Sequence, residues 1–133
     1  MSPDSSTPRG AVALEVSNGM VRLIAETTGR GPTKARTIFG RDEVMVSLRD
    51  TLTKGEANLV AGGYGDQVLE VRRNYQRVMQ PKAIELVEGL LGRRVIGFMS
   101  DNHLDPDLAV EVFILDPISG NGAGAVEADD TVE

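Results

Sequence analysis

The fold is decided by a stretch in the first half of the chain, KARTIFGRDEVMVSLR (residues 34–49). Residues 34–39 and 43–49 alternate between polar and apolar side chains with a period of two, which is the pattern of half-buried strands. The Gly-Arg-Asp sequence between them is typical of a tight turn. The stretch therefore predicts a β-hairpin. The side chains expected to face its core are Val44, Val46 and Leu48.

A second pair of strands is predicted towards the other end of the chain, at residues 95–99 and 108–115, joined by residues 100–107. A helical pattern precedes each pair: one covers residues 11–28, and a longer one begins at Thr53. Because both strand pairs are compatible with hairpins, the economical arrangement is a four-stranded antiparallel sheet with helices on one face. The sequence therefore predicts an α+β fold with the element order α-β-β-α-β-β.

Local signals divide the second helical region. Thr53 and Glu56 have the spacing of a capping box, in which each side chain accepts a hydrogen bond from the backbone of the other. Gly62 to Gly65 interrupt the pattern, and Asp66 is the predicted N-cap of the longer helix that follows. Pro81 lies inside that helix and is predicted to kink or divide it.

Composition limits the classes of function. The length of 133 residues fits one folded domain, predicted at residues 10–118, between disordered tails at 1–9 and 119–133. The net charge is −6, but five acidic residues lie in the tails, so that residues 9–118 hold 15 acidic and 14 basic side chains. A nearly neutral body argues against nucleic-acid binding. The absence of cysteine excludes disulfides and thiolate metal sites.

Hydropathy predicts a protein that does not enter the membrane. Residues 1–10 are rich in Ser and Pro and lack the apolar segment of a secretory signal. No run in the sequence approaches the roughly 18 apolar residues that span a bilayer. We therefore expect a cytoplasmic protein. Separately, we expect no cofactor.

The second face of the predicted sheet is unusually apolar. Helices are expected on one face, yet both faces of the strands carry large apolar side chains, and these need cover. A second copy of the chain is the simplest cover, so the pattern predicts a homodimer. The residues assigned to the second face are Ile38, Met45, Ile96, Phe98, Phe113 and Leu115.

Several short motifs, taken together, resemble one family. They are Gly29-Arg-Gly-Pro32, Leu52-Thr-Lys-Gly-Glu56, Arg72-Arg73, Leu91-Gly92, and Ser100-Asp101 ahead of the strand Val110-Glu-Val-Phe-Ile-Leu115. With the surrounding helices and hairpins they resemble the MpsC-like domain, named for the C component of a bacterial Na+-translocating, membrane-potential-generating system. The resemblance implies a small cytoplasmic protein linked to inorganic-carbon or cation transport, and it brings no catalytic residues.

The turn at residues 29–34 is a candidate anion site. A glycine-flanked turn exposes backbone amides, and its basic side chains would hold a phosphate, a carboxylate or bicarbonate. The alternative is a helix C-cap in which the proline blocks continuation of the helix. The spacing of a P-loop is absent. The candidate anion-binding residues are Arg30, Gly31, Thr33 and Lys34, with Arg72 and Arg73 from the second helical region.

The arginines of the long helix have two interpretations. Together they would form a basic patch, whereas a solvated helix face explains the same pattern without a ligand. An arginine near the apolar stripe is expected to pair with a buried or interfacial carboxylate, and the sequence offers Glu56 and Glu111 for this role.

The segment at residues 101–107 is a weak candidate metal site. It places potential ligands at alternate positions, and the strongest of them are His103, Asp101 and Asp105. Pro106 and Val112 stand where an EF-hand loop needs its glycine and its bidentate glutamate, which excludes that motif. The alternative is a polar hairpin loop whose side chains make local turn bonds.

These observations leave three functional hypotheses. The first is a non-catalytic accessory or regulatory domain that acts through protein–protein contacts, as a homodimer or with a protein partner at the membrane. The second is a binding module that responds to a small anion or a nucleotide. The third is a metal-dependent enzyme centred on His103.

Overall fold

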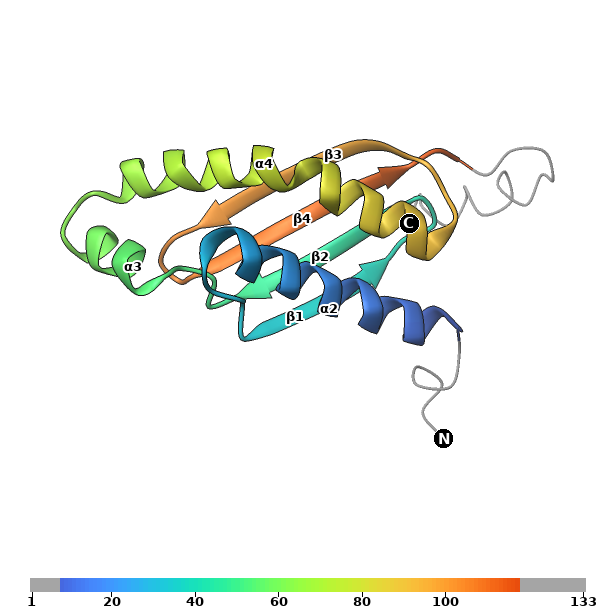
Figure 1. The fold of residues 1–133 in the computed structure, drawn as a ribbon, viewed down its shortest axis with the longest axis horizontal. Coiled ribbons are helices and arrows are strands. Elements are labelled where there is room, and N and C mark those ends of the chain that lie inside the picture. The colour runs from blue at the N-terminus through green and yellow to red at the C-terminus, as the bar shows by residue number, and fades with distance from the viewer. Residues whose placement is uncertain (1–7, 118–133) are drawn as a thin grey trace, which may run out of the picture.

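The computed structural model describes residues 8–117. A four-stranded antiparallel sheet carries helices across one face, which confirms the predicted α+β fold (Figure 1). The elements are α2 (Pro8–Thr28), β1 (Lys34–Phe39), β2 (Glu43–Arg49), α3 (Lys54–Ala61), α4 (Gly65–Leu91), β3 (Val95–His103) and β4 (Leu108–Leu115). The predicted interruption of the second helical region is confirmed, because residues 62–64 separate α3 from α4, which the predicted element order counted as one helical region. The predicted tails lie outside the described residues, except that α2 already begins at Pro8.

The last strand of the described residues lies inside the sheet. The strand order is β1-β2-β4-β3, so that β4 pairs with β2 on one side and with β3 on the other. Both predicted hairpins are confirmed. β3 runs beyond its predicted end at Met99, because the residues up to His103 still pair with β4 and leave a loop at 104–107.

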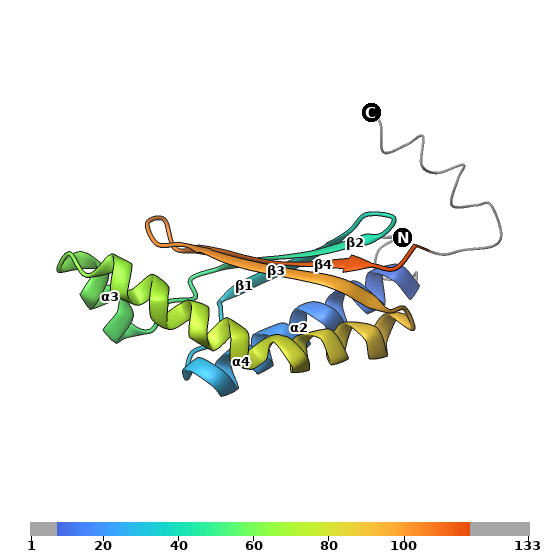
Figure 2. The same ribbon diagram turned by 90° about the horizontal axis from the view of Figure 1, so that it is seen from above.

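The core lies between the sheet and the two long helices. α2 and α4 pack side by side on the sheet, and Gly19 lies at their contact (Figure 2). A Cβ added to Gly19 would lie 2.7 Å from the methyl groups of Leu86, so this glycine allows the two helices to approach closely. The fully buried apolar side chains of this core include Val16, Met20, Val44, Val46, Ala83, Val87 and Phe113.

The predicted N-cap of α4 was wrong, and of the two outcomes predicted at Pro81, a kink or a division, the division is excluded. The N-cap is Tyr64, and Asp66 lies in the first turn, where a negative charge is favourable beside the helix dipole. α4 is not divided at Pro81. The proline removes one intrahelical hydrogen bond, to the carbonyl of Arg77, but both residues are exposed and water can solvate that carbonyl.

The sheet face opposite the helices, called the outer face below, differs in composition from the prediction. Phe113 and Leu115 of β4 point towards the helices, and Phe98 packs against Phe113 with ring centroids 4.9 Å apart. These three residues therefore belong to the core. β4 is apolar on both faces, so its alternation alone did not fix which side is inward. The β4 residues on the outer face are Leu108, Val110, Val112 and Ile114.

Candidate functional site

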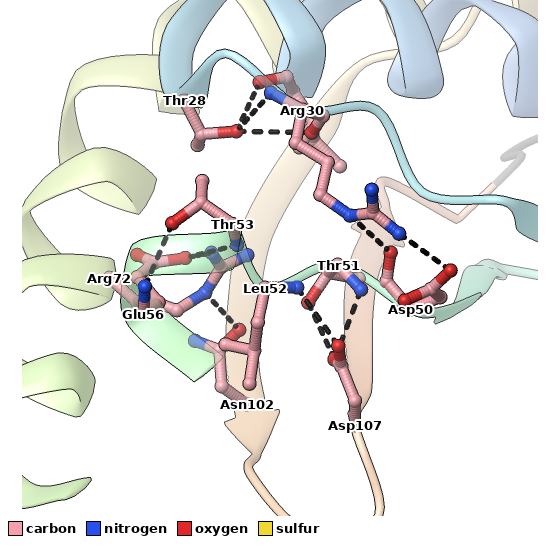
Figure 3. A network of polar contacts seen from close by, with 11 residues as sticks. Thr28, Arg30, Asp50, Thr51, Leu52, Thr53, Glu56, Arg72, Asn102 and Asp107 are labelled. Atoms are coloured by element: carbon pink, nitrogen blue, oxygen red, sulfur yellow. Dashed lines mark hydrogen bonds and ion pairs between the residues drawn. The ribbon is translucent and has the colours of Figure 1, made fainter. Parts of the chain in front are cut away.

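A polar network is buried where α3 and α4 meet the edge of the sheet (Figure 3). Arg72 of α4 donates from Nη1 to Glu56 Oε1 at 2.8 Å and from Nε to Asn102 Oδ1 of β3 at 3.1 Å. Arg72 is 5% exposed and Glu56 is 8% exposed. One guanidinium group therefore joins two helices and an edge strand, and the predicted pairing of an arginine with a buried carboxylate is confirmed for Glu56.

The position of Glu56 follows from the start of α3. The predicted capping box is present: Glu56 N donates to Thr53 Oγ1 at 3.1 Å, and Thr53 N donates to Glu56 Oε1 at 2.8 Å. The same carboxylate oxygen therefore caps the helix and binds Arg72. The other oxygen, Oε2, is buried and has no hydrogen-bond partner among the described residues.

A second buried carboxylate, Glu111, lies close to this network. It points inward from β4, is 2% exposed, and faces Ser100 across the β3–β4 ladder. Glu111 Oε1 and Ser100 Oγ are both buried, and among the described residues neither makes a hydrogen bond of good geometry. Burial raises the pKa of Glu111 from 4.5 to about 7, and the nearby Ser100 hydroxyl and the Arg72 charge oppose this rise only in part. Glu111 therefore exchanges a proton near neutral pH.

A third carboxylate fixes the segment that leads into α3. Asp107, the last residue of the β3–β4 loop, accepts hydrogen bonds at Oδ1 from the Thr51 amide and hydroxyl, both at 3.0 Å, and at Oδ2 from Leu52 N at 2.9 Å. Beside them, Arg30 forms an ion pair with Asp50 at 2.6 Å (Figure 3). The network thus connects the end of α2, the entry to α3, and both strands of the second hairpin.

The contacts of Asp107 predict a clear loss of stability on its removal. Asp107→Ala leaves three donors without their charged acceptor, so we expect the free energy of unfolding to fall by about 2–3 kcal/mol. Urea denaturation followed by circular dichroism measures this change. Asp116→Ala, an exposed carboxylate, is the matched control and should stay within about 0.5 kcal/mol of the parent chain. Equal losses in both variants would contradict the structural role of Asp107.

The residues of the predicted anion site are not gathered in one place. Arg30 pairs with Asp50, Arg72 is buried with Glu56, and Arg73 is exposed on α4. Lys34 lies on β1 with its side chain on the outer face. At the turn itself, Gly29 has φ +90° and donates its amide to Ala25 O, which is the geometry of a helix C-cap. This geometry favours the cap interpretation at Gly29. Gly31 and Thr33 follow in the connection to β1, where Thr33 N donates to Arg49 O, and anion binding stays a prediction.

The residues of the predicted metal site also separate. His103 Nδ1 lies 2.8 Å from Pro106 O, Asp105 is exposed in the loop, and Asp107 is turned towards Thr51. Asp101 accepts a hydrogen bond from the amide of its neighbour Asn102. Within residues 8–117 no group of three or more His, Cys, Asp or Glu residues lies close enough to hold a metal ion. Local turn bonds explain this segment.

Sequence reasoning found part of the network. The capping box and the pairing of an arginine with Glu56 follow from spacing. Asn102, Ser100 and Asp107 were missed as partners because they lie far from Arg72 and Thr51 in the sequence, and no local pattern links them.

In the described part of the chain, no helix has the length and hydrophobicity needed to cross a membrane.

A comparison with protein families identifies the family of this chain. The family model described as "Na+-translocating membrane potential-generating system (MpsC)" matches residues 8–117. An uncharacterised protein of Bacillus subtilis (strain 168), YrhF, is 26% identical over 102 residues, which is 74% of this chain and 84% of that protein. No solved structure matches the chain. Since the family model covers the whole described domain, the chain belongs to the MpsC family.

Proposed function

We propose that this chain is a non-catalytic accessory or regulatory domain that acts through protein–protein contacts on its outer face, in a bacterial system of cation or inorganic-carbon transport. The description of the family supports the link to cation transport, since it names a Na+-translocating system. The apolar composition of the outer face supports the proposed action through protein–protein contacts.

The observation that carries the proposal is an apolar row across all four strands. Register places Ile38 beside Met45, Met45 beside Val112, and Val112 beside Met99. Ile38 is 37% exposed and Met99 is 54% exposed. No helix of the described residues lies over this face (Figure 2). A continuous apolar surface of this kind on a small domain marks a contact site.

The buried polar network supports a structural use of the charged residues inside the domain. Arg72 is bound to Glu56 and Asn102, and Asp107 is bound to Thr51 and Leu52. These side chains hold the domain together and face inward. They are therefore not available to a partner, in contrast to the exposed side chains of the outer face.

Photo-crosslinking in the native host tests the proposal. A benzophenone amino acid placed at Met99, on the outer face, should give a crosslinked protein product after irradiation. The same amino acid at Leu14, an exposed apolar position on α2, is the matched control and should give none. If Met99 yields no protein crosslink above the Leu14 control, the outer face is not a protein-contact site and the proposal is wrong.

A further inference from the structure

We propose that the partner of the outer face is a second copy of this chain, bound face to face about a two-fold axis parallel to the strands, with Arg36 of one copy paired with Asp101 of the partner subunit. This inference rests on the proposed role of the outer face in protein contacts. To that role it adds three points: the partner is a second copy of the chain, a two-fold axis relates the two copies, and an ion pair joins them.

The register of the sheet defines the surface as rows that run across the strands. The apolar row is Ile38, Met45, Val112 and Met99. The next row, towards the β3–β4 loop, is Arg36, Ser47, Val110 and Asp101. Charges of opposite sign therefore stand at the two ends of one row, on the two edge strands β1 and β3.

Two-fold symmetry brings these ends together. A rotation of 180° about an axis parallel to the strands exchanges the two edges of the sheet and keeps each row in place. β1 of one copy then lies over β3 of the other. The apolar row covers its own symmetry mate, and Arg36 lies over Asp101 of the partner subunit twice in the dimer.

The alternative two-fold axis, perpendicular to the strands, fits less well. That rotation keeps each strand over its own mate and reverses the order of the rows. With the axis between the two rows, the apolar row would lie against the row that holds Arg36, Ser47 and Asp101. With the axis along the apolar row, that row would cover its own mate, but Arg36 and Asp101 would no longer face each other. With the axis between the rows, Arg49 would also lie towards Glu43 of the partner subunit, and this pair distinguishes the perpendicular axis from the proposed one. Burying apolar side chains against charged ones loses the hydrophobic gain.

The surroundings of Arg36 and Asp101 leave room for contacts with a partner subunit. Among residues 8–117, the exposed side chain of Arg36 has no hydrogen-bond or ion-pair partner. Beside Asp101, the outer face has a hollow of about 400 Å³ whose lining includes Ser47, His103 and Val110. A long side chain from a facing sheet can enter this hollow and reach the carboxylate.

The size of the face sets the expected affinity. Four strands spaced about 4.8 Å apart and paired over six or seven residues present a flat area of roughly 400 Å². The two copies together would cover roughly 800 Å² of such flat area, which is below the roughly 1,000 Å² of a typical specific interface and fits a weak, transient one. We therefore expect a reversible dimer with a dissociation constant on the order of micromolar, in which one ion pair repeated by symmetry has a measurable effect.

Charge reversal, followed by sedimentation equilibrium of the full chain, tests the pairing. Arg36→Asp and Asp101→Arg should each weaken dimerisation by about tenfold or more, because each places like charges opposite one another. The double variant restores opposite charges and should dimerise within about threefold of the parent chain. Arg73→Asp, on the exposed side of α4, is the control for a change of net charge and should have no effect. Thermal unfolding checks that each variant is folded.

The other outcomes separate this inference from the proposed function. If the parent chain stays monomeric well above micromolar concentration while Met99 crosslinks to a different protein, the second copy is the wrong partner and the contact role stands. If the double variant dimerises no better than the single ones, the proposed axis is wrong. Rescue of Glu43→Arg by Arg49→Glu would instead identify the perpendicular axis. Absence of any crosslink from Met99 overturns both proposals.

Discussion

Arg72→Ala is expected to lower the free energy of unfolding by about 3–5 kcal/mol, because it leaves a buried carboxylate without its cation. Among the described residues, the Glu56 side chain would keep only the backbone amide of Thr53 as a donor, and its second oxygen is already without a hydrogen-bond partner there. The link from α4 to Asn102 would also be lost. Urea denaturation measures the change, and far-ultraviolet circular dichroism is a suitable signal since the chain has no tryptophan.

The neighbouring Arg73 supplies a matched control for this experiment. It has the same side chain and lies on the same helix, but it is exposed. Arg73→Ala should therefore change the free energy of unfolding by no more than about 0.5 kcal/mol. A loss below about 1 kcal/mol in Arg72→Ala would show that the buried network contributes little to stability.

Glu111→Gln is expected to stabilise the domain in a pH-dependent manner. The folded state holds the proton of Glu111 up to a pKa of about 7, whereas the unfolded state releases it near 4.5. The contribution of Glu111 to stability is therefore full at acidic pH and is lost as the pH rises through 7. The glutamine cannot ionise, so the gain of the variant over the parent chain should grow to about 3 kcal/mol at alkaline pH.

Denaturation of both proteins at a series of pH values between about 4 and about 8 tests the expected profile. The difference in the free energy of unfolding should rise between pH 4.5 and 7 and then level off. Glu85→Gln, an exposed carboxylate on α4, should show no comparable rise. A difference that is independent of pH would mean that Glu111 is not protonated by burial in the folded domain.

Much of the fold follows from local patterns in the sequence. The alternation at residues 34–49 identified the first hairpin and its buried side chains, Val44, Val46 and Leu48. The spacing of Thr53 and Glu56 identified the start of α3. Each of these features depends on residues only a few positions apart in the sequence. The interactions that produce them therefore lie within the segment itself.

The errors arise where distant residues decide the outcome. β4 is apolar on both faces, and the direction of Glu111 is set by the helices that cover that face of the sheet, so the inward side of β4 could not be read from its own residues. Pro81 is tolerated because its side of α4 faces solvent, which depends on how the helix packs. The contact of Asp107 with Thr51 joins segments that no sequence pattern relates.

The central position of β4 has a consequence for synthesis on the ribosome. The first hairpin emerges early, but the exposed edge of β2 finds its neighbour only when the last strand has left the exit tunnel. Until then the nascent chain carries two incomplete edges, on β2 and on β3, each able to pair with another chain. Folding of this small domain is therefore completed late, and any ribosome stalled before Leu108 carries a chain that is prone to aggregate.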